Sequence, residues 1–152
     1  MNSPDELVPA TSPLRPTLQP VSPPDPAINR RFYRDVGTSW DWNDRATWTL
    51  GQWAANLAAN PISTLTLHHS KSTIGYSELL LAGGDIEIVY FGLLPEFVGH
   101  GLGGTSLEAV TRHAWSLPGT RRVWLHTCEA DHPAALANYQ RRGFKQFKTE
   151  HT

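Results

Sequence analysis

Four glycines stand directly in front of an amphipathic segment, within LLPEFVGHGLGGTSLEAV, residues 93–110. They are Gly99, Gly101, Gly103 and Gly104. Because glycine has no Cβ atom, it adopts positive φ angles and allows another group to approach the backbone closely. A helix that begins after such a turn presents unpaired N–H groups and a partial positive charge, and both favour anions. The turn contains no Lys or Arg, so backbone amides would hold a phosphate here; close packing of a helix on a sheet explains the same glycines equally well.

Two common nucleotide-binding patterns do not fit this turn. The Lys-Ser/Thr pair that ends a P-loop is absent. The glycine spacing also differs from G-x-G-x-x-G, and the acidic residue that should follow about 20 positions later is missing. A dinucleotide-binding fragment is therefore a remote alternative.

One charged residue, Glu87, interrupts the apolar segment IEIVYFGLL at residues 86–94. Burial in a strand covered on both faces removes water from a carboxylate and raises its pKa, which suits a general base. Such a base contributes a factor of roughly 10² to 10⁴ when a nucleophile must lose a proton. The alternative is an inward-pointing carboxylate that pairs with an arginine for structural reasons.

Two other clusters of reactive side chains carry weaker signals. Cys128 with His126 and His132 could supply a thiol nucleophile, but an inert buried cysteine is the commoner occupant of a strand end. His68 and His69 are adjacent, so on a strand they point to opposite faces and cannot bind one metal ion together. We expect no metal site.

Two groups of side chains could line a pocket for an acceptor molecule. Tyr76 and Glu78 share one face of a predicted strand, where they either line such a pocket or face solvent. The tryptophans Trp40, Trp42 and Trp48 are more typical of core anchors, with a cation-binding aromatic cage as the alternative.

The hydrophobic pattern predicts the elements that position these residues. We expect helices over residues 24–37, 49–60, 102–117 and 132–142. We expect strands over residues 17–21, 62–69, 73–82, 86–94, 121–128 and 144–150. Antiparallel strands come first and a β-α-β-α-β alternation follows, which predicts an α/β fold with a mixed sheet.

Composition indicates one domain with a tail. Eight of the 12 prolines fall within the first 26 residues, so we predict a disordered Pro-rich tail over residues 1–13 and a single domain over residues 14–152. The hydrophobic fraction of 39% is sufficient for a core in a chain of 152 residues.

Charge and cysteine content exclude several classes of partner and location. The formal net charge of −1 gives no reason to expect nucleic acid or an anionic membrane as a partner. No apolar run approaches the roughly 18 residues of a membrane span, and the N-terminus does not resemble a secretory signal. A single cysteine suits a reducing compartment, so we expect a cytoplasmic protein.

Two motifs resemble the Gcn5-related N-acetyltransferase (GNAT) family. The family's signature of Arg or Gln, two residues, Gly, one residue, and Gly or Ala falls on residues 98–103, with Val98 in the place of Arg or Gln. The second signature has Asn, then Tyr seven residues later and a helix-ending Gly-Phe. In this sequence His132 stands in the place of the Asn, Tyr139 matches the Tyr, and residues 143–144 are the Gly-Phe.

The resemblance implies a GNAT-like fold and acetyl-CoA as co-substrate. It implies that the turn clasps the pyrophosphate and that a splayed central strand pairs with the pantetheine amides. The implied cofactor-binding residues are Phe91, Gly92, Leu93, Val98, Gly99, His100, Gly101, Leu102, Gly103, Gly104 and His132. Glu87 falls on the position of a general base, and Tyr139 on that of the acid which protonates the departing thiolate.

The activity implied is N-acetyl transfer to a primary amine of a small molecule or peptide, by direct attack in a ternary complex. The alternative is a catalytically inactive module that binds acyl-CoA as a sensor or scaffold. An exposed edge at the last predicted strand, residues 144–150, would suit a homodimer.

Overall fold

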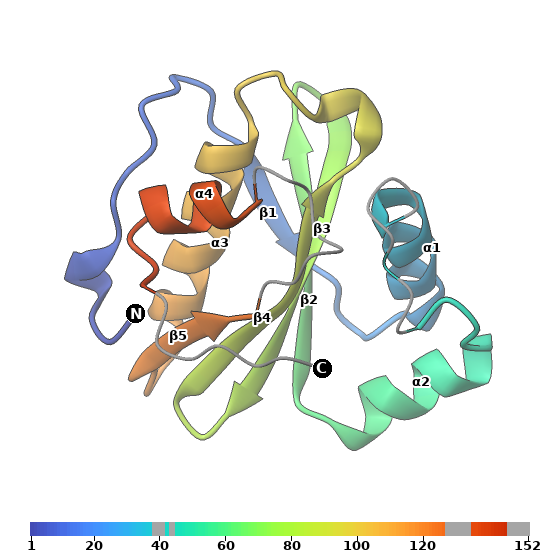
Figure 1. The fold of residues 1–152 in the computed structure, drawn as a ribbon. Coiled ribbons are helices and arrows are strands. Elements are labelled where there is room, and N and C mark those ends of the chain that lie inside the picture. The colour runs from blue at the N-terminus through green and yellow to red at the C-terminus, as the bar shows by residue number, and fades with distance from the viewer. Residues whose placement is uncertain (38–41, 43–44, 127–134, 146–152) are drawn as a thin grey trace.

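The computed structural model describes residues 1–37, 42, 45–126 and 135–145. It contains a five-stranded sheet in the order β1-β2-β3-β4-β5 (Figure 1). The strands are β1 (Thr17–Pro20), β2 (Ile62–His69), β3 (Ser72–Ala82), β4 (Asp85–Leu93) and β5 (Arg122–Leu125). The pairs from β1 to β4 are antiparallel, and β5 runs parallel to β4, which confirms the predicted mixed α/β sheet.

The helices divide between the two faces of the sheet (Figure 1). They are α1 (Pro26–Gly37), α2 (Leu50–Ala59), α3 (Gly103–Ser116) and α4 (Ala135–Arg141), with short 3-10 turns η1 (Pro4–Glu6) and η2 (Pro95–Phe97). On one face, α1 and α2 pack through an aromatic cluster that includes Tyr33 and Trp53. On the other face, Leu107, Val110 and Ala114 of α3 pack against the aliphatic core of the sheet.

Tight turns and a register shift in each of the two central hairpins shape the sheet. Ser70 and Lys71 have φ angles of 49° and 68° in the β2–β3 turn, where the sequence predicted a turn. In the β3–β4 hairpin, Glu78 pairs with Tyr90 while Leu79 pairs with Ile88, so β4 carries one extra residue at this point. Such a bulge twists and bends the strand that contains it.

The last part of β4 separates from β5. The parallel pairing runs from Asp85 with Arg122 to Ile88 with Leu125. Beyond Ile88, β4 continues to Leu93, and no strand within the described residues pairs with that edge. The start of α3 and one side of α4 lie at this end of the sheet (Figure 1).

The N-terminal segment differs from the disordered tail that we predicted for residues 1–13. The N–H of Val8 donates to the carbonyl of Arg142 at 2.8 Å, and the N–H of Ala10 donates to Oε1 of Glu108 at 2.8 Å. Leu7 and Ala10 are buried. Prolines prevent a helix here, but an extended segment can still dock where other groups accept its remaining N–H donors.

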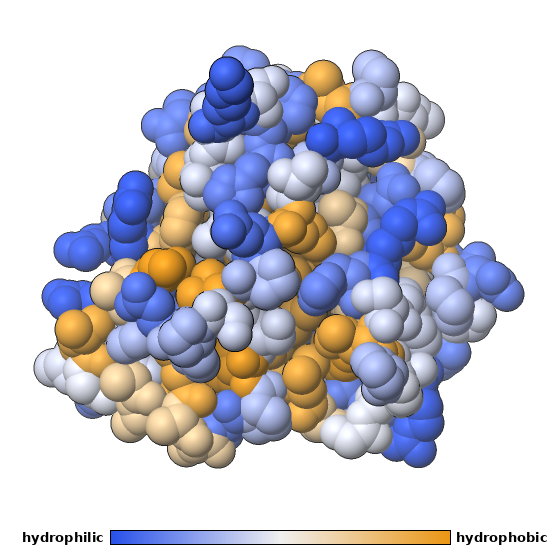
Figure 2. Space-filling view, turned by 180° about the vertical axis from the view of Figure 1, so that it is seen from behind, coloured by the Kyte–Doolittle hydropathy of each residue, from blue (hydrophilic) through white to orange (hydrophobic). Residues whose placement is uncertain are grey.

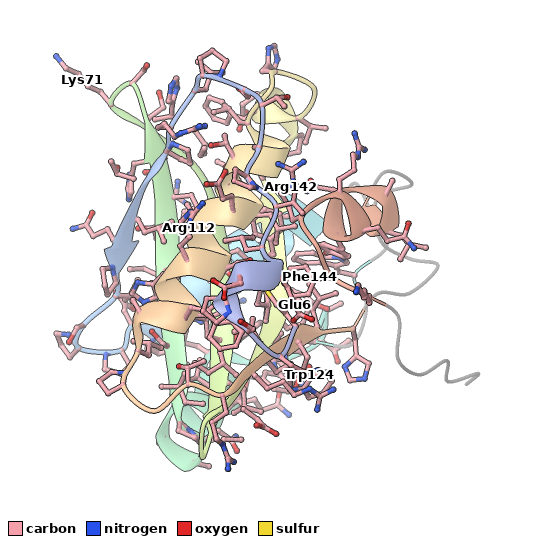
Figure 3. All side chains as sticks on the ribbon, turned by 90° about the vertical axis from the view of Figure 1, so that its left-hand side faces the viewer. Glu6, Lys71, Arg112, Trp124, Arg142 and Phe144 are labelled. Atoms are coloured by element: carbon pink, nitrogen blue, oxygen red, sulfur yellow. The ribbon has the colours of Figure 1, made fainter. Side chains whose placement is uncertain are left out.

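Two observations strengthen this docking. Gly143 has a φ of +106°, and a side chain at this position would collide with the carbonyl oxygen of Glu6. Burial by itself would raise the pKa of the Glu108 carboxyl, but the hydrogen bond from Ala10 and the Arg112 guanidinium together hold that pKa below its ordinary value. Figure 3 shows Glu6, Phe144 and Arg142 along this segment beside α3.

Some predicted elements extend beyond the described residues. The strand expected over residues 121–128 is observed as Arg122–Leu125, and the helix expected over residues 132–142 as Ala135–Arg141. Of the last predicted strand, only Phe144 and Lys145 are described, and neither is in a strand.

The described surface is mixed in character. Hydrophobic residues lie scattered among hydrophilic ones on the face that Figure 2 shows. Across the described ranges, none of the helices has the length and apolar character needed to cross a membrane.

Candidate active site

A cavity of about 530 Å³ opens where β4 separates from β5. Its walls come from the end of β4, the glycine turn, the start of α3, one face of α4, the end of α1 and the N-terminal segment. Residues far apart in the sequence, Val36 and Tyr139 among them, thus meet around one space. The cavity brings together most of the residues predicted to hold the cofactor: Phe91, Gly92, Leu93, Val98, Gly99, Gly101, Gly103 and Gly104.

Two of the predicted cofactor residues that the structure describes do not line this cavity. His100 is exposed and does not border the cavity. Leu102 precedes α3 as its N-cap residue, with its side chain only 4% exposed in the hydrophobic core, so only its backbone faces the turn. His132 lies outside the described residues.

Glycine is required by the backbone at two positions of the turn. Gly99 and Gly101 have φ angles of 82° and 78°, which L side chains rarely adopt. Gly103 has no such angle, and a Cβ there would come no closer than 3.9 Å to Nδ2 of Asn138. A substitution at Gly103 therefore adds atoms to the cavity without straining the turn.

The start of α3 has no side-chain cap. Leu102 is apolar and makes no capping hydrogen bond, so the first N–H groups of the helix have no side-chain acceptor at that position. Nearby, Nδ2 of Asn138 in α4 donates to the carbonyl of Gly103 at 3.4 Å. This contact ties α4 to the helix start that closes one end of the cavity.

Tyr139 lies in the wall of the cavity. Its side chain projects from α4, the residue is 8% exposed, and its ring packs edge-on against Phe144 with centroids 6.5 Å apart. A phenol that is held by packing and borders a cavity can donate a proton to a group bound there.

Glu87 does not line the cavity. Its neighbours Ile86 and Ile88 pack into the core beneath α3, so its side chain points to the opposite face of the sheet. There its Oε2 lies 3.2 Å from Nδ1 of His126, a partner that the sequence did not predict. Phe91, at the cavity, lies about 13 Å further along the strand.

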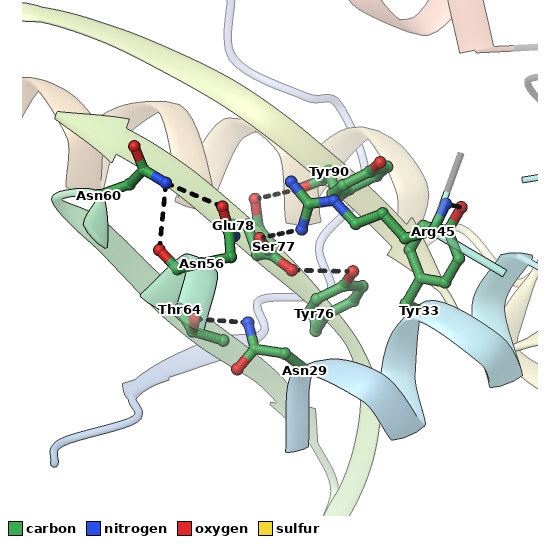
Figure 4. A network of polar contacts seen from close by, with 10 residues as sticks. All are labelled: Asn29, Tyr33, Arg45, Asn56, Asn60, Thr64, Tyr76, Ser77, Glu78 and Tyr90. Carbon is green, nitrogen blue, oxygen red and sulfur yellow. Dashed lines mark hydrogen bonds and ion pairs between the residues drawn. The ribbon is translucent and has the colours of Figure 1, made fainter. Parts of the chain in front are cut away.

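Tyr76 and Glu78 are both fully buried, so neither faces solvent nor lines the open cavity. Glu78 pairs with Arg45, whose Nη1 lies 3.1 Å from Oε1, and the Tyr76 hydroxyl lies 3.4 Å from Oε2 (Figure 4). Burial and the neighbouring carboxylate raise the pKa of Tyr76 well above its ordinary value of 10, so its hydroxyl stays protonated and donates.

Of the tryptophans considered for a cation-binding cage, Trp48 contacts a cation, and that cation is Arg45 of the chain itself. The guanidinium carbon of Arg45 lies 4.6 Å from the ring centre of Trp48, 5.0 Å from Trp53 and 4.8 Å from Tyr90. Trp42 instead borders the cavity, and Trp40 lies outside the described residues.

Among the described residues, the other reactive clusters add no site. His68 makes hydrogen bonds with Thr66 and Thr73, and no three His, Cys, Asp or Glu side chains among the described residues are grouped to hold a metal ion. Cys128 lies outside the described residues.

The sequence interpretation missed several contributors to the cavity, among them Asn138, Arg142 and the N-terminal segment at residues 10–12. One signal was available for the first two, because they are four residues apart on a predicted helix and so share a face with each other. The docking of the N-terminal segment had no comparable signal.

Comparisons with known proteins agree on a family. The profile described as "Acetyltransferase (GNAT) family" matches residues 26–144. Among curated proteins, none matches this chain significantly.

Solved structures with the same fold include three acetyltransferases. An acetyltransferase from Thermus thermophilus is 25% identical, with a TM-score of 0.64 over 89% of this chain and 90% of that one. A PaiA N-acetyltransferase from Thermoplasma acidophilum, solved with coenzyme A, is 16% identical, with a TM-score of 0.66 over 90% and 94%. A spermidine N-acetyltransferase from Vibrio cholerae, solved with CoA and spermine, is 16% identical, with a TM-score of 0.70 over 88% and 83%.

Proposed function

Because the chain belongs to the acetyltransferase (GNAT) family, we propose that it transfers the acetyl group of acetyl-CoA to a primary amine. The amine attacks the thioester directly while both substrates are bound. One observation carries the proposal: a single cavity joins the part of the β4 edge that no described strand covers, the glycine turn, the uncapped start of α3 and the side chain of Tyr139.

The shape of this cavity suits the parts of acetyl-CoA. Phosphates are anions, and the free N–H groups at the start of α3 with the partial positive charge of the helix favour them. The pantetheine arm carries amides, which pair with a strand edge as an added strand would, here at Phe91, Gly92 and Leu93. With the phosphates at the start of α3 and the pantetheine arm along residues 91–93, the thioester lies towards the middle of β4 and near Tyr139.

The transfer step requires two proton movements. The amine nitrogen forms a bond to the carbonyl carbon, the C–S bond breaks, and its electron pair leaves with sulfur. Tyr139 donates its hydroxyl proton to that thiolate and recovers a proton from solvent. Glu87 accepts the proton of the amine, and because it lies about 13 Å of strand from Phe91, this proton passes through water.

An amine acceptor is supported by a relative of the same fold. The spermidine N-acetyltransferase from Vibrio cholerae was solved with spermine, a polyamine. The acceptor approaches the cavity between Val36 and Trp42, on the α1 side of β4. We therefore expect polyamines to be informative members of an acceptor panel.

A second candidate function is acyl-CoA binding without catalysis. Two observations favour it: Val98 stands in the place of the signature's Arg or Gln, and Glu87 lies away from the cavity.

One experiment separates these functions. Free thiol is measured during incubation with acetyl-CoA and a panel of polyamines, aminoglycosides, amino acids and N-terminal peptides. Amine-dependent thiol release supports the transferase. Binding of acetyl-CoA in calorimetry without thiol release from any amine supports the binding module, and absence of both contradicts both.

A further inference from the structure

The side chain of Arg142 lies beside the first residues of α3. Arg142 directly follows α4 and continues its hydrogen-bonding pattern, because its N–H donates to the carbonyl of Asn138 at 3.1 Å. Its side chain therefore shares a face with Asn138, which contacts Gly103. Its guanidinium carbon lies 3.7 Å from the point that a Cβ of Gly104 would occupy, and the residue borders the cavity.

This guanidinium has no hydrogen-bond partner among the described residues. Arg142 is 9% exposed, and neither Nε nor Nη1 has solvent contact or a hydrogen-bond acceptor. Among the described residues no carboxylate forms an ion pair with it; Glu108, on the same side of α3, is occupied by Ala10 and Arg112. A buried charge is costly unless an opposite charge and hydrogen bonds compensate for it.

Two independent features thus favour an anion at one point. The first is the uncapped start of α3, and the second is the unpaired Arg142 beside it. We propose that Arg142 binds the pyrophosphate of acetyl-CoA, with its planar fork on phosphate oxygens that the first N–H groups of α3 also contact. This inference rests on the proposed function, since it names the part of acetyl-CoA that the residue binds.

The position of Arg142 indicates that it binds the pyrophosphate of acetyl-CoA and not the 3′-phosphate. The pantetheine arm extends from the pyrophosphate, and its proposed partner, residues 91–93, ends β4 just before the turn. Arg142 contacts the helix start at Gly104, where that turn ends. The 3′-phosphate belongs to the ribose, on the far side of the pyrophosphate from the arm.

The test compares Arg142 with an arginine that does not border the cavity. Arg142→Met removes the buried charge, and Arg30→Met removes the same charge from an exposed position on α1. Calorimetric titration with CoA should show Kd raised about tenfold or more by Arg142→Met, because charge-assisted hydrogen bonds are lost. Arg30→Met should change Kd by less than about threefold, as for an exposed charge. Equal effects of the two substitutions would overturn the proposal.

Truncated ligands locate the phosphate. The loss caused by Arg142→Met should persist with dephospho-CoA, which lacks the 3′-phosphate, and disappear with pantetheine, which lacks all phosphates. A loss that disappears already with dephospho-CoA would overturn the assignment to the pyrophosphate.

Thermal unfolding without ligand separates binding from a structural role. Because the charge has no partner among the described residues, Arg142→Met should leave Tm unchanged or raise it, while reducing the increase in Tm that CoA produces. A large fall in Tm without ligand would overturn the proposal. If Arg142→Met does not fold, Arg142→Lys, which keeps the charge but not the fork, should weaken dephospho-CoA binding, and unchanged binding would count against Arg142.

Inorganic pyrophosphate distinguishes this inference from the proposed function. Binding of pyrophosphate that depends on Arg142, in a protein that does not bind acetyl-CoA, would contradict the function but support the anion site. A wild-type protein that binds neither ligand would overturn both.

Discussion

Arg45, whose side chain is 13% exposed, and Arg142, which is 9% exposed, differ in the groups that surround them. Arg45 packs against three aromatic rings and pairs with Glu78 at 3.1 Å. Arg142 borders a cavity, and two of its nitrogens have neither solvent nor an acceptor. On the α1–α2 face of the sheet, the arginine is therefore neutralised by a carboxylate of the same chain. At the end of the sheet where β4 separates from β5, which we call the splayed end, the arginine has no such partner among the described residues.

This difference separates a stabilising region from a binding region. Breaking a buried ion pair leaves an uncompensated charge, whereas removing an unpaired buried charge relieves a cost. We therefore expect substitutions on the α1–α2 face to change stability, and substitutions around the cavity to change binding and turnover.

The largest expected effect is on the paired side. Glu78→Ala should lower the free energy of unfolding by about 3–5 kcal/mol, because it leaves the Arg45 charge buried without its partner. Urea unfolding followed by tryptophan fluorescence measures this change, with Arg142→Met as the matched comparison. A loss below about 1 kcal/mol for Glu78→Ala, the size of an exposed ion pair, would remove the contrast between the two regions.

A substitution of Glu87 tests whether a residue outside the cavity takes part in catalysis. Glu87→Gln should lower turnover at pH 7 by roughly 10² if this carboxylate accepts the amine proton. The difference from wild type should narrow at high pH, where the amine is already deprotonated. Initial rates of thiol release across pH give the answer, and a variant within twofold of wild type at pH 7 would make the Glu87–His126 pair structural.

A pair of tyrosines allows the same contrast with smaller changes. Tyr139→Phe should reduce turnover about tenfold or more, because the acid hydroxyl is lost while the ring is kept. Tyr33→Phe is the control, since its hydroxyl accepts the N–H of Arg45 at 2.9 Å and should affect stability alone. The Tyr139→Phe loss should shrink with an acetyl donor whose thiol is more acidic; an equal loss with both donors would argue against the acid role.

The smallest effect concerns the N-terminal segment. The pKa of Glu108 is lowered in the folded protein, so the stability it contributes is complete above its unfolded value of 4.5 and disappears as pH falls below that value. Hydrogen exchange at the Ala10 amide should therefore lose protection in acid in wild type. In Glu108→Gln, protection of the Ala10 amide should be lower at pH 7. It should also no longer change between neutral and acidic pH, because the titrating carboxyl is absent. A wild-type amide that is equally protected at pH 3 and pH 7 would show that Glu108 does not hold the segment.

The sheet and helices were largely predictable from the sequence. Alternating and helical periodicity, with proline and glycine at the boundaries, located β2, β3, β4, α1, α2 and α3 to within a few residues. The glycine turn and Tyr139 could be assigned to one site because both signatures are local patterns with fixed spacing. Such signatures can be recognised in the sequence because all of their residues lie within a few positions of one another.

Pairing in three dimensions could not be predicted in the same way. Nothing local distinguishes Arg45, which a distant glutamate neutralises, from Arg142, which has no partner in the described chain. The docking of residues 1–13 depends on acceptors at Glu108 and Arg142, far along the chain. The interaction of Glu87 with His126 likewise depends on the parallel register of β4 and β5.

Binding of acetyl-CoA to Gly103→Val tests most directly whether the cavity at the splayed end is the cofactor site. Because this position tolerates a Cβ without strain, the variant should keep the wild-type Tm while its side chain fills the space beside Asn138. In calorimetric titration we expect one acetyl-CoA bound per chain in wild type and no measurable binding in the variant. A folded Gly103→Val protein that binds acetyl-CoA with wild-type affinity would contradict the account.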